Sequence, residues 1–168
     1  LAIALHVAGM DGGAIYLADD ATGAFELVQH QGFSPEFVQA AHQYAPGAPN
    51  TQMILSGKPL YFADADLSGW EWQATENLHA VAVIPFVDHG RVLGCMNVAS
   101  HKMNAVPRLA REMLETIAPE IGNLITYLRT DTMLRQSEER YRLLAENMRD
   151  AVWANNLLGE HTYFSPSV

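Results

Sequence analysis

Cysteine is almost absent from this chain of 168 residues, and Cys95 is the only one. A single thiol excludes an internal disulfide, a zinc site built from several thiolates and a dithiol redox pair. This composition is typical of a reducing compartment, so we expect a cytoplasmic protein.

Basic residues are also scarce, with 10 Lys and Arg against 19 Asp and Glu and a formal net charge of −9. Nucleic-acid binding requires a basic face, and an anionic membrane surface repels an acidic chain. The longest apolar run, residues 80–87, is far shorter than the roughly 20 residues of a membrane helix. We therefore expect neither a nucleic-acid partner nor membrane contact.

Hydrophobic residues make up 49% of the chain and charged residues only 17%. This balance supports a folded domain with a sizeable core and argues against a largely disordered chain. The sequence has no initiating Met, and its last predicted strand pair is unfinished. We expect a fragment of a longer polypeptide.

Two strand hairpins are predicted by short connections rich in turn formers. Residues 14–18 and 25–30 flank one such connection, and residues 79–87 and 91–99 flank another that ends in Gly. Connections this short join antiparallel strands, since a parallel crossover needs a dozen or more residues. The second pair is apolar on both faces, so the sheet should be covered on both sides.

Short helices are expected between the two hairpins. Ser34 and Pro35 are typical of a helix start, and the apolar face that follows extends to Tyr44. Asn50 is the expected N-cap of a second short helix, and residues 60–63 are the expected strand after it.

A long helical pattern occupies residues 107–148, with Pro119 inside it as the expected site of a kink. Its apolar residues form two rows at 3/4 spacing, offset from each other by one residue. The second row has the heptad-like spacing of a dimer seam, and its expected contacts are Leu134, Tyr141, Leu144 and Met148.

The order of elements resembles a GAF domain, a small-molecule sensor module of signalling proteins. Residues 13–17 (GAIYL) are similar to the family's first strand, and residues 83–86 with 90–100 (VIPF…GRVLGCMNVAS) are similar to its hairpin signature. The resemblance covers residues 1–128. It implies an α/β fold with a central antiparallel sheet covered by helices and a long C-terminal exit helix.

The end of the chain resembles the start of a PAS domain. Residues 137–147 are similar to its entry helix, and residues 150–153 and 163–167 to its first two strands. We therefore divide the chain into a GAF-like sensor domain (1–128), a connecting signalling helix (129–149) and a truncated PAS-like start (150–168). This order is similar to that of sensor histidine kinases of two-component systems.

The resemblance implies a ligand-sensing module that relays its state through a homodimeric helix to downstream PAS and kinase domains. The alternative is a ligand-free, GAF-shaped spacer that only dimerises. No nucleophile–base pair, phosphate loop or metal-ligand spacing is present, so we predict no catalysis by this chain and no metal site. A kinase activity would belong to the parent protein.

Cys95 lies in a predicted apolar strand and is expected to be a buried hydrophobe. Relatives that attach a bilin typically carry His after the cysteine, whereas Met96 follows here, and methionine sulfoxide reductases of the family use several cysteines. His79 and His42 are conceivable haem ligands, but ordinary hydrogen bonding explains a histidine better. No particular ligand is indicated, and neither bilin nor haem is expected.

The ligand pocket is expected between the sheet and residues 37–78, with Trp70 and Trp72 near its mouth. Aromatic rings provide large apolar walls and an indole donor. The alternative, that both rings only pin a loop to the core, stays open. Tyr44 and His79 complete the predicted ligand-binding set.

Overall fold

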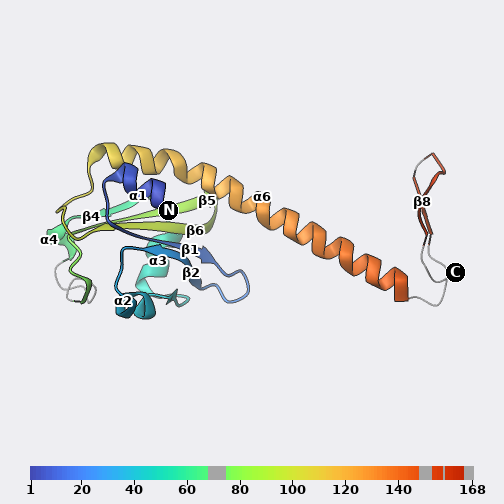
Figure 1. The fold of residues 1–168 in the computed structure, drawn as a ribbon, viewed down its shortest axis with the longest axis horizontal. Coiled ribbons are helices and arrows are strands. Elements are labelled where there is room, and N and C mark those ends of the chain that lie inside the picture. The colour runs from blue at the N-terminus through green and yellow to red at the C-terminus, as the bar shows by residue number, and fades with distance from the viewer. Residues whose placement is uncertain (68–74, 148–152, 157, 165–168) are drawn as a thin grey trace. The chain divides into compact units, whose positions relative to one another are not determined.

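A computed structural model describes residues 1–67, 75–147, 153–156 and 158–164 (Figure 1). The chain divides into two compact units, Leu1–Thr126 and Tyr127–Val168. The first unit contains the sheet and the helices that cover it. The second contains the rest of the long helix and a small hairpin.

The first unit is built on one antiparallel sheet of six strands in the order β3-β2-β1-β6-β5-β4. Both predicted hairpins belong to this sheet, and they join where β1 of the first hairpin pairs with β6 of the second. The strands are β1 (Gly12–Ala18), β2 (Phe25–Gln31), β3 (Gln43–Tyr44), β4 (Leu60–Phe62), β5 (Ala80–Asp88) and β6 (Arg91–Ser100).

Helices cover both faces of this sheet, as the apolar second hairpin predicts. In Figure 1, α1 (Ala2–Ala8) and the start of α6 (Arg108–Asn147) lie on one face. On the opposite face lie α2 (Pro35–Ala40) and α3 (Pro49–Leu55). A single turn, α4 (Asp64–Leu67), follows β4. The predicted GAF-like α/β fold is confirmed.

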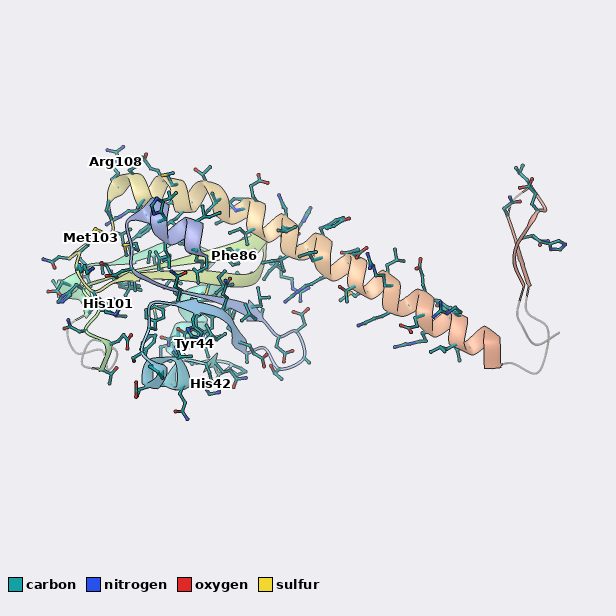
Figure 2. All side chains as sticks on the ribbon, viewed as in Figure 1. His42, Tyr44, Phe86, His101, Met103 and Arg108 are labelled. Atoms are coloured by element: carbon teal, nitrogen blue, oxygen red, sulfur yellow. The ribbon has the colours of Figure 1, made fainter. Side chains whose placement is uncertain are left out.

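Alternation along the central strands separates two cores, since successive strand side chains point to opposite faces. Ile84 and Phe86 of β5 pack with Leu114 of α6 in the core beneath α1 and α6. Val83 of β5 packs with Ile54 of α3 in the core on the other face. Figure 2 shows Phe86 and Tyr44 on opposite sides of the sheet.

The helix predicted to extend to Tyr44 is shorter, and the prediction is wrong at that residue. Ser34 caps α2 as expected, since its hydroxyl accepts the Phe37 N–H at 3.2 Å. The helix ends at Ala40. Tyr44 instead lies in β3, where it pairs with Phe25 of β2. Pairing with an open sheet edge outweighs the helical spacing, which is only a local preference.

One further correction concerns a short helix. Asn50 is not the cap of α3, because Ala48 holds that position and no side chain caps the helix. The apolar start of the chain forms α1, which ends at Gly9 in the left-handed conformation at φ 64°. A two-turn helix of this kind is stabilised by packing rather than by its own propensity, and Leu5 supplies that packing as a buried residue.

The predicted long helix is present as α6, which is continuous through Pro119. In the second unit, β7 (Trp153–Asn155) pairs antiparallel with β8 (His161–Phe164). β7 shares Trp153 with the first expected strand (150–153), and β8 shares Tyr163 and Phe164 with the second (163–167); the other residues of both expected strands lie outside the described residues, and the start of a PAS domain remains a prediction. Among the helices that the structure describes, none combines the length and apolarity that a membrane crossing needs.

Candidate ligand pocket

A small, partly open cavity of about 20 Å³ lies between the sheet and α3. Strands β5 and β6 form its floor, β3 forms one wall and α3 covers it. Its lining is mostly apolar with two amides and one phenol: Tyr44, Asn50, Met53, Ile54, Val81, Val83 and Asn97. A cavity of this volume holds about one water molecule.

The polar groups of this face form a short hydrogen-bonded chain. The Asn97 side-chain amide donates to the Tyr44 hydroxyl at 3.3 Å, and the Cys95 thiol donates to Asn97 Oδ1 at 3.5 Å. The Tyr16 hydroxyl donates to the Ala41 carbonyl at 2.8 Å. Buried polar groups require such partners, so this chain fixes the orientation of Asn97 beside the cavity.

The rings of Tyr16 and Tyr44 stack on each other beside these hydrogen bonds. The Tyr16 and Tyr44 ring centroids lie 4.4 Å apart with 22° between the ring planes. Burial raises the pKa of Tyr16 to about 12 and the pKa of Tyr44 well above its ordinary value. Both phenols are therefore neutral at physiological pH, and they offer hydrogen bonds rather than charge.

Cys95 is the buried strand residue that the sequence predicts, with none of its surface exposed. Burial raises the pKa of the thiol far above its ordinary range. The thiolate is the reactive form of cysteine, so this environment keeps Cys95 inert as a nucleophile.

The predicted ligand-binding residues separate in the structure. Tyr44 lines the cavity. His79 instead bonds through Nδ1 to Asp64 Oδ1 at 2.7 Å and lies outside the cavity lining. Trp70 and Trp72 lie outside the described residues.

His42, the other conceivable haem ligand, is exposed (Figure 2), and its carbonyl accepts the Leu27 N–H of β2 at 2.9 Å, outside the cavity lining. Within the part of the chain that the structure describes, no group of three or more His, Cys, Asp or Glu residues could hold a metal ion.

Asn97 and Asn50 are the pocket residues that sequence reasoning missed. Asn97 stands in the apolar run of β6, where a polar residue on a buried strand indicates a required hydrogen bond. That signal was available in the sequence. Asn50 was assigned to a helix cap, a role that the preceding Pro49 removes by occupying the first helical position.

The outer side of α3 borders an open depression of about 710 Å³, which shares Asn50 and Met53 with the α3 cavity. The helix α3 therefore lies between the cavity and this depression. The chain enters this helix after Gly47 and leaves it at Gly57, both at positive φ.

A buried carboxylate fastens the segment that follows the undescribed residues. Glu76 is 7% exposed, and its two oxygens accept the Ser34 N–H at 2.7 Å and the Ser34 hydroxyl. His101 Nε2 lies 3.6 Å from the same carboxylate, and His101 Nδ1 lies 3.1 Å from Asp11. This cluster joins the start of α2 to the ends of β1 and β6.

An apolar groove of about 390 Å³ lies on the other face of the sheet, between α1 and α6. Ile3 of α1 and Met113, Ile117 and Leu124 of α6 line it and are exposed. Hydrogen-bonding side chains like those of the α3 cavity are missing from its described lining, apart from Glu120.

The predicted dimer seam lies in the second unit. Leu134, Tyr141 and Leu144 are exposed on α6, with 57%, 70% and 54% of their surface accessible. The side chain of Met148 lies outside the described residues. Three large apolar side chains at helical spacing are unpartnered in the single chain, which is the condition that a helix partner would satisfy.

Solved structures show where this fold recurs. A domain of a protein described as a two-component sensor histidine kinase from Sinorhizobium meliloti 1021 matches with a TM-score of 0.67 and 22% identity, covering 81% of this chain and 92% of that one. The GAF domain of a phosphoenolpyruvate-protein phosphotransferase from Coxiella burnetii matches with a TM-score of 0.65 and 19% identity, covering 77% and 79%.

The GAF domain of the cyanobacteriochrome TePixJ matches with a TM-score of 0.65 and 13% identity, covering 77% of this chain and 86% of that one. Identities this low show a shared fold. A search of curated proteins gave no match. The family model for the GAF domain, however, matches residues 1–126. The chain therefore belongs to the GAF domain family, whose members are sensory and regulatory modules of signalling proteins.

Proposed function

We propose that the chain is a sensory module that binds a small molecule between the sheet and α3 and relays its state through α6. The observation that carries this proposal is the partly buried Asn97–Tyr44 hydrogen bond in a mostly apolar cavity. Ligand sites commonly combine apolar walls with a few fixed polar groups. A core used only for packing needs no such pair, since apolar side chains fill space without hydrogen-bond partners.

At about 20 Å³ the cavity is too small for a ligand larger than water, so binding requires α3 to move outward. Its N-terminus has no side-chain cap, and it is held by the buried Ile54 and by the Thr51 hydroxyl on the Ala45 carbonyl at 2.7 Å. Movement of α3 would join the cavity to the outer depression. Since no charged side chain is among the described lining residues, the expected ligand is neutral, with a hydrogen-bonding group for Asn97.

Native mass spectrometry of the purified chain, followed by a thermal-shift screen of small neutral metabolites, tests this proposal. A hit should stabilise the native chain, and Asn97→Leu should abolish that stabilisation. Asn123→Leu makes the same chemical change at an exposed position of α6 and should leave it intact. A hit that survives Asn97→Leu would place the ligand elsewhere.

The alternative function, a ligand-free spacer, is favoured by one observation, the cavity volume of about 20 Å³. Under this alternative, Tyr44 and Asn97 only satisfy each other in a filled core. A screen without any hit, together with unchanged stability on adding low-molecular-weight metabolites from a cell extract, would favour the spacer.

We also propose that α6 pairs in parallel with its copy in a homodimer, along Leu134, Tyr141, Leu144 and Met148. An isolated helix must bury its apolar stripe against something, and a parallel pair keeps both downstream regions on one side. Light scattering should give a dimer mass that Leu134→Glu converts to a monomer. Gln136→Glu, on an exposed neighbouring position, should leave the dimer intact.

The parent protein is, in this proposal, a cytoplasmic sensor histidine kinase with a PAS domain after α6. Support comes from the GAF family membership and from the match to a domain of a protein described as a sensor histidine kinase. Phosphotransfer assays on the full-length protein, with and without the ligand, would test the output.

A further inference from the structure

The turn between β5 and β6, together with the last two residues of β5 (Val87 and Asp88), approaches α6 at two points one helical turn apart. The Thr126 hydroxyl donates to Asp88 Oδ2 at 2.6 Å. At Gly122, which is buried, a Cβ atom would lie 3.0 Å from the Val87 carbonyl oxygen. Residues four apart lie on the same face of a helix, so both contacts fasten one face of α6 to one turn.

The turn has an irregular backbone that presents Asp88 to the helix. The strand register shifts between Phe86 and Val87, and such irregularities redirect side chains. His89 adopts a φ of 46°, a conformation that is uncommon for a residue other than glycine. Its Nδ1 lies 2.7 Å from Asp88 Oδ1, so the two carboxylate oxygens have separate partners.

The strands that end in this turn are the ones that form the floor of the α3 cavity. Val83 of β5 and Asn97 of β6 are register partners and both line the cavity. Along the same two strands, the ladder ends at the pair Asp88 and Arg91. A change in strand position at the cavity can therefore be carried to the turn along this ladder, across the register shift at Phe86 and Val87.

The part of α6 that meets the turn has weak internal restraints. Pro119 has no N–H and cannot make the helical hydrogen bond to the carbonyl four residues earlier. Gly122 follows within one turn, and glycine lowers helix stability by about 1 kcal/mol relative to alanine. External contacts consequently have a larger share in fixing this stretch than they would in a regular helix.

We infer that Asp88, Thr126 and Gly122 form a latch through which the β5–β6 hairpin controls the backbone of α6 around Pro119. The inference rests on the proposed sensory function, because it names the route by which the cavity reaches the exit helix. Asp88 and Thr126 are positioning residues in this scheme and do not touch the ligand. As long as Thr126 is hydrogen-bonded to Asp88, the latch keeps the backbone of α6 around Pro119 in one conformation. Loss of this hydrogen bond lets that stretch of the helix change conformation.

Hydrogen–deuterium exchange of the whole chain tests the latch without any ligand. Thr126→Val is nearly isosteric and removes only the hydroxyl, and it should raise amide exchange in residues 119–130 about tenfold, as expected for loss of one charge-assisted hydrogen bond. Thr116→Val is the matched control, since the Thr116 hydroxyl bonds only the Glu112 carbonyl of its own helix at 2.7 Å. Thr126→Ser keeps a hydroxyl and should restore slow exchange.

A double-mutant cycle separates the latch from two unrelated effects. Asp88→Ala should raise exchange in the same residues as Thr126→Val, and the double variant should exchange no faster than either single one. Additive effects, or an effect of Thr126→Val no larger than that of Thr116→Val, would overturn the latch.

The relay is tested by perturbing the cavity in place of a ligand. Asn97→Leu removes the amide that bonds Tyr44 beside the cavity, and it should change exchange in residues 119–130 in the native chain but not in the Thr126→Val chain. If the Asp88–Thr126 contact is merely structural, Asn97→Leu should change amide exchange equally in the native chain and in the Thr126→Val chain. That result would overturn the inference. Failure to find a ligand would count against the proposed function alone, because neither exchange experiment uses one.

Discussion

The two faces of the central sheet are both buried, but they are built from different chemistry. Towards α1 and α6 the core consists of aliphatic, Met and Phe side chains, such as Ile84, Phe86 and Leu114. Towards α2 and α3 it includes the hydroxyls of Tyr16 and Tyr44, the thiol of Cys95 and the amide of Asn97. The first face stabilises the exit helix by packing, whereas the second requires matched hydrogen bonds.

Because of this difference, the two faces of the sheet should tolerate different kinds of substitution. Apolar packing is tolerant of the choice of side chain provided that volume is conserved. Buried polar groups allow far fewer arrangements, because each group left without a partner costs roughly 1–3 kcal/mol. We therefore expect the α1/α6 face to respond to changes of volume and the α2/α3 face to respond to changes of hydrogen bonding and pH.

The largest expected effect is on the apolar face. Leu114→Ala should lower the free energy of unfolding by about 2–5 kcal/mol, because the side chain is 1% exposed and its removal leaves a cavity. Leu109→Ala is the matched control on the same helix, with 67% exposure, and should change it by less than about 0.5 kcal/mol. Urea denaturation measures both. Equal losses would contradict the assignment of this face as the packing core.

The second effect belongs to the phenols of the polar face. The folded pKa of Tyr16 is raised to about 12 from 10.0, so the folded chain keeps its proton where the unfolded chain loses it. The contribution of Tyr16 to the free energy of unfolding is fully present below pH 10. It is lost as the pH rises towards 12, by about 2–3 kcal/mol in total. Denaturation midpoints between pH 9 and 12 measure this loss.

Tyr16→Phe should make that alkaline decline shallower by about the share of one phenol, because Tyr44 and Cys95, whose pKa values burial also raises, still titrate. Tyr127→Phe removes a phenol that is 68% exposed and should leave the decline unchanged. If the free energy of unfolding of the Tyr16→Phe variant falls with pH as steeply as that of the native chain, the alkaline loss must originate in another group.

The smallest effect is the loss of one buried hydrogen bond at neutral pH. Tyr16→Phe leaves the Ala41 carbonyl without its side-chain donor and should cost about 1–2 kcal/mol, while Tyr127→Phe should cost close to none. Thermal unfolding at pH 7 measures the difference between the two variants. A loss of the same size in both would remove the distinction between the two faces.

The hairpins and the long helix were predictable because their signals are local. The turn formers at residues 19–23 and 88–90 lie between strands that pair with each other directly. The 3/4 spacing of α6 continues for many turns and outweighs Pro119. The order of these elements also led to the GAF resemblance, which the family model confirms.

The site was predicted less completely. Tyr44 lines the cavity, but it reaches it from β3 and not from a helix, because the free edge of β2 pairs with it. His79 had equal standing as a sequence candidate, and its bond to Asp64 places it elsewhere. Asn97 was passed over because a strand pattern records which residues are apolar and does not show which polar residue gains a buried partner.

The sequence by itself determined the α/β class, the antiparallel hairpins, the extent of α6 and the burial of Cys95, because each depends on neighbours within a few residues along the chain. Only the tertiary structure decided that Asn97 meets Tyr44, that Glu76 fastens Ser34, and that Thr126 meets Asp88. These pairs join residues 53, 42 and 38 positions apart. Which of many polar side chains meet over such separations is set by strand order and helix packing, and no local preference encodes it.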